Sequence, residues 1–144
     1  MDDRTGNTEF NDTESYDKER QLARMRADRF VCDLIGIRLT DAGPGWAHAE
    51  LDLTELHLNG VGIVQGGVLF TLADYAFAAA CNYDQEVVGI ETSVSYIKSV
   101  KSGRIRAEAK EVARTRKFAV CEVQVLDEND RLLILFRGRG YVLS

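Results

Sequence analysis

The stretch from Gly66 to Cys81 constrains the fold more than any other, because its pattern is helical and it is apolar on almost every side. Leucine and alanine recur at three- and four-residue spacing, and aromatic residues and a cysteine cover the adjoining face. The residues of these two faces are Leu69, Leu72, Ala73, Ala76, Ala80, Phe70, Phe77 and Cys81. Since no broad polar stripe is left for water, we expect this helix in the centre of the fold.

Asp74 lies in the middle of this apolar helix, with Phe70, Phe77, Ala78 and Cys81 on its own face. An ionised carboxylate withdrawn from water is costly unless it is paired, hydrogen-bonded or exposed in a cleft. Two interpretations are open. Strand N–H groups or an arginine satisfy the carboxylate, or it is a functional group in a cleft.

Two glycines, Gly66 and Gly67, open the helix. Glycine is disfavoured inside a helix but suits a helix start, where free N–H groups point outward and backbone comes close to a ligand. Such an N-terminus can hold a developing oxyanion, but it lies about 12 Å from Asp74 along the axis, at 1.5 Å per residue. An acyl-transfer site that uses both groups therefore needs one of them from elsewhere.

The segment from His57 to Asp74 carries Asn59 and the run Gln-Gly-Gly at Gln65–Gly67. This segment resembles the signature of the hotdog-fold acyl-CoA thioesterases of the PaaI-like (phenylacetate-degradation) group, and the resemblance extends from about residue 30 to the end. It implies an α+β hotdog fold, with a curved antiparallel sheet wrapped around a long central helix. It also implies a homodimer with shared active sites, in which the carboxylate of one chain faces the helix N-terminus of its partner.

The resemblance also implies roles for the residues of this segment. The Gly66 N–H, with Gly67 nearby, would hold the thioester oxygen, and Asp74 of the other subunit would act as general base or as nucleophile. Asn59 would position the water or the surroundings of the leaving sulfur. The family motif usually begins with histidine, and Gln65 in its place would hydrogen-bond near the carbonyl.

Two further groups of candidates bind substrate. In some members of the family a hydroxyl residue on the strand after the helix assists, and Thr92 and Ser93 are the nearest candidates. The segment from Ile97 to Lys117 holds eight basic and two acidic residues in a chain of net charge −5. A solvated strand face explains most of these charges, but Lys98, Arg116 and Lys117 are candidates to neutralise the phosphates of coenzyme A.

Hydrophobic patterning predicts the rest of one domain over residues 17–144, after a polar, disordered tail over residues 1–16. An amphipathic helix is expected over 16–30 and a hairpin from strands 31–40 and 46–53, with a turn at 41–45. Four more strands are expected in a meander after the central helix, at 86–97, 104–114, 118–126 and 131–143. An antiparallel sheet curled around one apolar helix is the economical packing of this order.

Several functions are not expected from this sequence. The net charge argues against nucleic-acid binding, and no apolar run is long enough to span a membrane. The three cysteines form no Cys-x-x-Cys pair and fit free thiols in a reducing, cytoplasmic compartment. The histidines, His48 and His57, have no metal-ligand spacing with them and are not expected to be catalytic. We expect no cofactor, because coenzyme A is part of the substrate.

The sequence thus predicts a thioester hydrolase that acts on an aromatic or a short- to medium-chain acyl-CoA. The alternative from another class is a non-catalytic module that binds acyl-CoA or an acyl carrier on the same fold. A hotdog dehydratase would carry a catalytic histidine and a proline-rich motif before the helix, whereas the single proline, Pro44, lies in a turn. Beyond the homodimer, we expect a dimer of dimers, a homotetramer.

Overall fold

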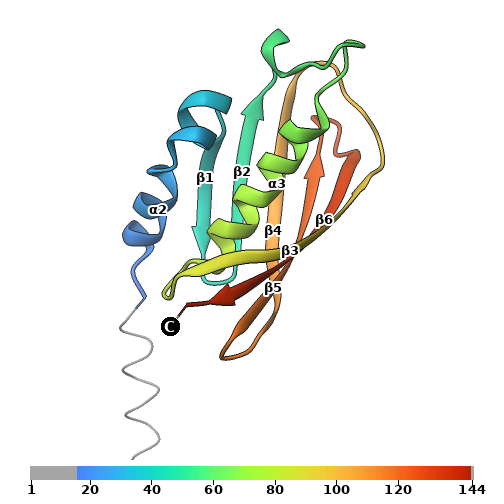
Figure 1. Ribbon diagram of the computed structural model, residues 1–144. Coiled ribbons are helices and arrows are strands. Elements are labelled where there is room, and N and C mark those ends of the chain that lie inside the picture. Colours follow the sequence, from blue (N-terminus) through green and yellow to red (C-terminus); the bar gives the residue numbers. More distant parts are fainter. Residues whose placement is uncertain (1–15, 144) are drawn as a thin grey trace, which may run out of the picture.

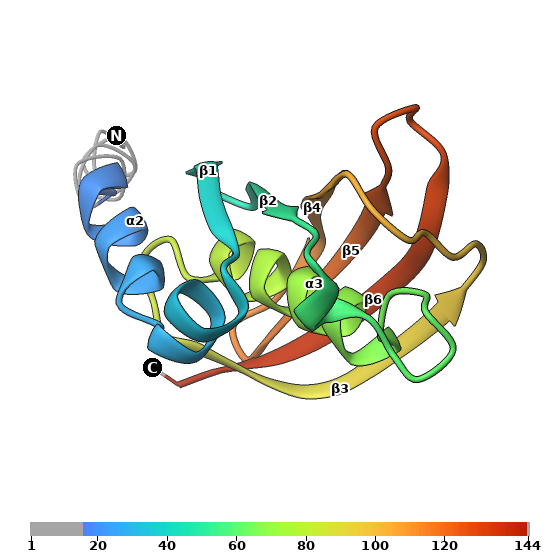
Figure 2. The same ribbon diagram turned by 90° about the horizontal axis from the view of Figure 1, so that it is seen from above.

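The computed structural model describes residues 16–143, which form one curved antiparallel sheet wrapped around a single helix (Figure 1, Figure 2). The central helix α3 spans Gly66–Cys81, as its pattern predicts. The strands are β1 (Arg38–Gly43), β2 (Trp46–Asp52), β3 (Val87–Tyr96), β4 (Arg104–Arg114), β5 (Phe118–Leu126) and β6 (Leu132–Val142). Apart from Tyr16, the expected polar tail lies outside the described residues. No helix among residues 16–143 is long and apolar enough to cross a membrane.

The strands pair in the order β1-β2-β4-β5-β6-β3. The prediction of a four-strand meander is right for β4, β5 and β6 but wrong for β3, which pairs with β6. Both edges of β4 are occupied, by β2 and β5, so no edge is left for β3. The connection from β3 to β4 passes the N-terminal end of α3, where the Val100 carbonyl accepts the Val64 N–H at 2.9 Å.

The expected strand over residues 31–40 is wrong in its first half. Helix α2 (Lys18–Arg26) is followed by a π-helical turn, η1 (Phe30–Ile35), and β1 begins only at Arg38. Gly36 ends the turn with a left-handed φ of 94°, and the N–H groups of Gly36 and Ile37 both donate to the Val31 carbonyl. The turn of the first hairpin is also shorter than expected, because β1 runs on to Gly43.

Helix α2 lies along the edge of the sheet formed by β1 (Figure 2). The Gln21 side chain donates to the Gly43 carbonyl at 3.0 Å and to the Ala79 carbonyl at 2.8 Å. Arg26 donates to the Leu39 carbonyl at 2.8 Å. The bonds to Gly43 and Leu39 satisfy backbone acceptors of β1 with side chains of α2, so α2 covers this edge of the sheet, and the bond to Ala79 joins α2 to α3.

The core lies between α3 and the concave face of the sheet. Strands β2 and β4 turn mainly alanines toward the helix, and all four of Ala47, Ala49, Ala107 and Ala109 are buried. Such small side chains let the sheet approach α3 closely. Ten of the sixteen residues of α3 are buried, which confirms the prediction of a central helix.

One aromatic ring of α3 occupies a groove made by glycines. A Cβ atom built on Gly138 of β6 would lie 2.8 Å from the ring of Phe77, and one on Gly89 of β3 would lie 3.2 Å from it. The Phe77 ring also lies 5.8 Å from the ring of Phe136. The glycines therefore make room for the side chain that joins α3 to β3 and β6.

We predict that Gly138→Ala lowers the free energy of unfolding by about 1–3 kcal/mol, because the added methyl group overpacks the Phe77 groove. Urea unfolding measures this change as a lower midpoint at an unchanged slope. Gly60→Ala is the matched control, because no atom lies within 4 Å of its added Cβ. Equal losses in both variants would contradict the overpacking explanation.

Candidate active site

Asp74 opens into a cavity of about 390 Å³ between α3 and β3. The cavity is lined by Asp74, Phe77, Ala78, Cys81, Val87, Gly89, Ile90, Glu91 and Thr92. Its carboxylate forms no hydrogen bond or ion pair with the other residues from 16 to 143. Of the two interpretations of Asp74, the geometry therefore favours a carboxylate in a cleft.

The surroundings of Asp74 disfavour its ionised form. Burial raises the pKa of the Asp74 carboxyl, and the negative charge of Asp28, which follows α2, raises it further. A carboxylate with a raised pKa accepts a proton more readily than an ordinary aspartate.

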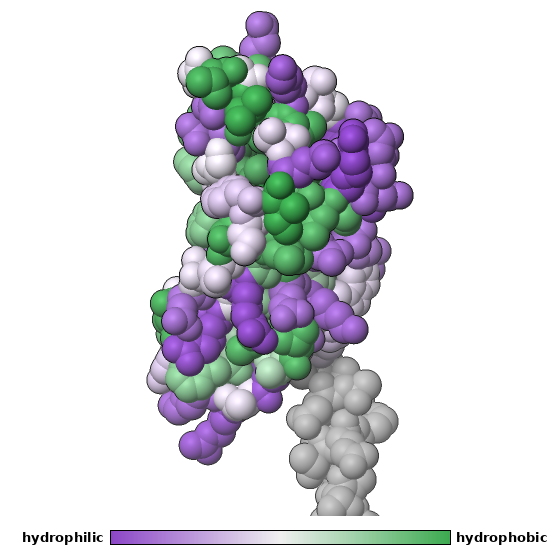
Figure 3. All heavy atoms as spheres, turned by 90° about the vertical axis from the view of Figure 1, so that its right-hand side faces the viewer, coloured by the Kyte–Doolittle hydropathy of each residue, from purple (hydrophilic) through white to green (hydrophobic). Residues whose placement is uncertain are grey.

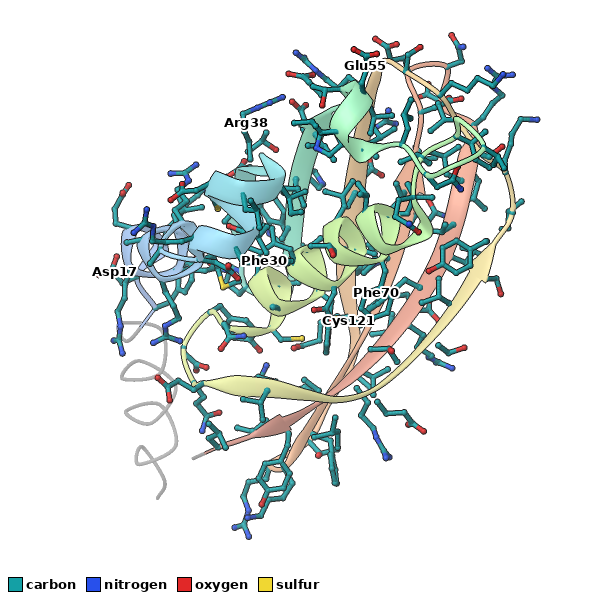
Figure 4. All side chains as sticks on the ribbon, turned by 45° about the horizontal axis from the view of Figure 1, so that its top comes forward. Asp17, Phe30, Arg38, Glu55, Phe70 and Cys121 are labelled. Carbon is teal, nitrogen blue, oxygen red and sulfur yellow. The ribbon has the colours of Figure 1, made fainter. Side chains whose placement is uncertain are left out.

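Phe70, on the same helix face, extends toward β6, where its ring lies 5.7 Å from that of Phe136 (Figure 4).

The first turn of α3 presents a free backbone donor. Gln65 is the N-cap, and its side-chain oxygen accepts the Gly67 N–H at 3.5 Å. Its carbonyl accepts the Val68 N–H at 2.9 Å. The Gly66 N–H has no hydrogen-bond partner among the described residues, so it remains available to an oxyanion at the positive end of the helix.

Tyr96, at the end of β3, is a residue of this site that the sequence analysis missed. Its hydroxyl donates to the Gly66 carbonyl at 3.3 Å. The alternation of Thr92, Val94 and Tyr96 along β3 is the signal that points to it, because these residues share one face of the strand.

The loop before α3 uses two of its polar side chains for its own structure. The Asn59 side-chain oxygen accepts the N–H groups of Val61 at 3.0 Å and Ile63 at 3.2 Å. One ring nitrogen of His57 accepts the Thr54 N–H at 3.0 Å, and the other donates to the Ile35 carbonyl at 2.8 Å. His57 thus ties the loop to η1, in agreement with a structural role.

Strand β3 separates the two hydroxyl candidates. Thr92 lines the Asp74 cavity, whereas Ser93 lines a larger hollow of about 1150 Å³ on the outer face of the sheet. That hollow contains neither Asp74 nor Gly66. Of the two, only Thr92 lies beside the carboxylate.

The basic candidates lie at opposite ends of α3. Lys98 is in the β3–β4 connection, at the Gly66 end, where its N–H donates to the Leu133 carbonyl. Arg116 and Lys117 are in the β4–β5 turn, near the C-terminal end (Figure 1). Of the eight basic residues between Ile97 and Lys117, three form ion pairs within residues 16–143: Arg104, Arg106 and Arg114. No cluster of residues in the described part of the chain could hold a metal ion.

The edge of the sheet at β3 has no pairing strand among residues 16–143. Apolar side chains are exposed along and just beyond it, with 46% of Val88, 49% of Ile90, 56% of Tyr96 and 52% of Ile97 accessible. Figure 3 shows hydrophobic residues interspersed among hydrophilic ones on the side of the molecule where β3 ends. This edge lies beside both the Asp74 cavity and the N-terminus of α3.

Comparison with known proteins identifies the family. The model of the Thioesterase superfamily matches residues 61–134, just over half of the chain. A protein of Archaeoglobus fulgidus is 34% identical over 125 residues, which cover 85% of this chain and 81% of the relative. Acyl-coenzyme A thioesterase PaaI of Escherichia coli is 28% identical over 109 residues, which cover 74% and 78%. The solved structure of E. coli PaaI superposes with a TM-score of 0.82 at 25% identity, covering 88% of this chain and 94% of that one.

The curved sheet, the central helix and the matched segment define a hotdog-fold hydrolase. The chain belongs to the Thioesterase superfamily, in its PaaI-like group, and is a thioester hydrolase. These findings confirm the family, fold class and enzyme class expected from the sequence.

We predict that Asp74→Asn stabilises the folded protein near pH 7. Because the folded pKa lies above the unfolded value, the wild type loses stability as pH rises from the ordinary aspartate pKa through the raised one. The stability that Asp74→Asn gains over the wild type should therefore vanish at pH values below the ordinary aspartate pKa. Thermal melting of both proteins across this range measures it.

Asp52→Asn is the control of opposite sign. The Arg104 side chain, and Arg38 beside it, hold the pKa of Asp52 below its ordinary value. Their stabilisation is present above the ordinary pKa and is lost as pH falls through the lowered one, so this variant should be less stable near pH 7. A destabilised Asp74→Asn protein at pH 7 would show that the carboxylate has a stabilising partner.

Proposed function

We propose that this protein hydrolyses the thioester of an aromatic or a short- to medium-chain acyl-CoA to the free acid and coenzyme A. One observation carries the proposal. A half-buried carboxylate that has no partner among residues 16–143, Asp74, opens into a cavity on the helix whose N-terminus presents the Gly66 N–H. The name of the E. coli relative, an acyl-coenzyme A thioesterase, supports the substrate class.

The two groups act on opposite parts of the reacting thioester. The thioester oxygen accepts the Gly66 N–H, and the positive end of α3 stabilises the negative charge that develops on this oxygen. Asp74 either removes a proton from the attacking water or attacks the carbonyl carbon itself. In both routes the C–S bond breaks, and coenzyme A leaves as the thiol after it takes up a proton. In the second route the acyl group stays on Asp74 as a mixed anhydride, which water then hydrolyses to the free acid and the carboxylate.

A homodimer joins these groups into one site. Within one chain Gly66 and Asp74 are eight residues apart, about 12 Å along the helix axis. Antiparallel pairing of two β3 edges would bring the α3 N-terminus of one subunit toward the Asp74 cavity of its partner. The open, partly apolar edge of β3 supports this pairing.

The remaining candidates fit around this shared site. Thr92 lines the cavity beside Asp74 and would contact the acyl group or the water. The Asn59 amide nitrogen donates to none of the described residues. It would position the attacking water or the groups around the leaving sulfur of coenzyme A. Lys98 of one subunit and Arg116 or Lys117 of the other would approach the phosphates of coenzyme A.

Further assembly and location are also part of the proposal. Two dimers would pack into a tetramer, and the outer face of the sheet offers a surface for this contact. The three cysteines are free thiols, which supports a reducing, cytoplasmic environment.

The first test measures free-thiol release from phenylacetyl-, benzoyl-, butyryl- and decanoyl-CoA. We expect turnover by the wild type and a loss of about 10²–10⁴-fold in kcat for Asp74→Asn, because the proton acceptor or nucleophile is removed. Asp52→Asn, far from the cavity, should keep wild-type turnover. Thioester binding without thiol release by the wild type would instead support a non-catalytic acyl-CoA module.

A second test mixes subunits to locate the site. Gly66→Pro removes the N–H and keeps the helical backbone, because proline suits the first helical position and the Gln65 backbone (φ −66°, ψ 130°) suits the residue before proline. Its added Cβ would lie 3.4 Å from the Tyr96 ring, an ordinary van der Waals contact. We expect this variant to fold, by circular dichroism, and to lose about 10²–10³-fold in kcat.

Mixed with Asp74→Asn, the proline variant should recover activity. Each hybrid dimer would contain one site with an intact Asp74 and an intact Gly66, and random pairing gives about a quarter of wild-type turnover. The two variants are unfolded together and refolded, and each variant refolded alone is the control. No recovery on mixing would place both groups of a site in the same subunit.

A further inference from the structure

The peptide between Gly66 and Gly67 is held at both of its polar ends. Its carbonyl oxygen, on Gly66, accepts the Tyr96 hydroxyl at 3.3 Å, and its N–H, on Gly67, donates to the Gln65 side chain at 3.5 Å. Because a peptide unit is planar, fixing the oxygen also fixes the direction of the N–H. Tyr96 therefore adds a second constraint, besides the helical hydrogen bond, on the orientation of the first peptide plane inside α3.

This peptide needs an external support. Glycine has the greatest backbone freedom of all residues, and the N–H groups of the first helical turn have no intrahelical acceptor. Within α3 the Gly66–Gly67 peptide is therefore held only through its carbonyl, which accepts the N–H one turn further on, and its N–H end keeps freedom to tilt. Oxyanion stabilisation depends on donors that are already fixed when charge develops, so a tilting peptide would weaken it.

The ring of Tyr96 adds a packing contact to its hydrogen bond. A Cβ atom on Gly66 would lie 3.4 Å from the ring, so the hydroxyl end of the ring lies close to the glycine backbone. Tyr96 is also the last residue of β3, the strand with the unpaired edge, and 56% of it is exposed. One side chain thus links the open sheet edge to the helix N-terminus.

The Gln65 contact with the same peptide is weaker. Its 3.5 Å separation is at the long limit for a hydrogen bond, and Gln65 is exposed. An incoming thioester oxygen can share the Gly67 N–H with it. Tyr96 is then the closer-bonded of the two side chains that support this peptide.

We propose that Tyr96 is a positioning residue of the oxyanion site, which holds the Gly66–Gly67 peptide so that the Gly67 N–H, beside the N–H of Gly66, meets the thioester oxygen. The assignment rests on the proposed function, because it concerns the oxyanion of that reaction. Tyr96 acts through the backbone and does not touch the reacting atoms.

Tyr96→Phe tests the assignment, because it keeps the ring and removes the hydroxyl. We expect kcat to fall about three- to tenfold, the worth of one neutral hydrogen bond in the transition state, with KM changed less than about twofold. The acid limb of the pH–rate profile should stay in place, since Asp74 is not affected. Tyr83→Phe is the matched control, because Tyr83 donates to Glu111 at the same 3.3 Å, just past the C-terminal end of α3. Its kcat should stay within about twofold of the wild type.

A double-mutant cycle with Gln65→Ala adds a readout that a purely structural role would not give. Because both side chains bind one peptide unit, their effects on kcat should not be additive. The assignment would be overturned if Tyr96→Phe left kcat unchanged, raised KM alone or shifted the pH profile. It would also be overturned by an equal loss of kcat in Tyr83→Phe or by additive effects in the cycle.

A readout without substrate separates this inference from the proposed function. In the ligand-free protein, the ¹⁵N order parameter of the Gly67 N–H should fall in Tyr96→Phe and not in Tyr83→Phe. If the wild type hydrolyses no thioester, the proposed function fails, and this measurement still decides whether Tyr96 fixes the peptide. An unchanged order parameter would overturn the inference.

Discussion

The need to cover an apolar helix on nearly all sides determines the architecture of this protein. A flat sheet would cover only one side of α3, whereas a curved sheet with alanines on β2 and β4 reaches around it. The cover stays incomplete along the stripe that faces β3, and Asp74 lies there. The same packing that buries the helix therefore gives one carboxylate a cavity, removes it from most of the water and raises its pKa.

Local patterns predicted the parts of the fold that depend on neighbours in sequence. The limits of α3 and the inward alternation of β2, β4 and β5 follow from short-range periodicity. The turn at Phe30–Ile35 was mistaken for a strand, because a short apolar run fits both patterns and Gly36 decides between them. The place of β3 beside β6 depends on residues some 45 positions apart, which periodicity does not contain.

The candidate site divides in the same way. Gly66 and Asp74 were identified from residue type and spacing on one helix. The His57 bond to Ile35 and the approach of Tyr96 to Gly66 join segments 22 and 30 residues apart, so no local pattern contains them. Thr92 and Ser93, adjacent in sequence, lie on opposite faces of β3, and only the bulge near Gly89 fixes which one reaches the cavity.

The two edges of the sheet differ, and this difference limits how far the sheet can grow. Side chains of α2 occupy backbone acceptors of β1, while β3 keeps a bare row of donors and acceptors. A sheet with two bare edges can add strands without end, as in a fibril. With one edge blocked, two copies that meet through β3 leave only blocked edges outside. Such a dimer would close the assembly after a single step, and α2 would thereby protect it against polymerisation.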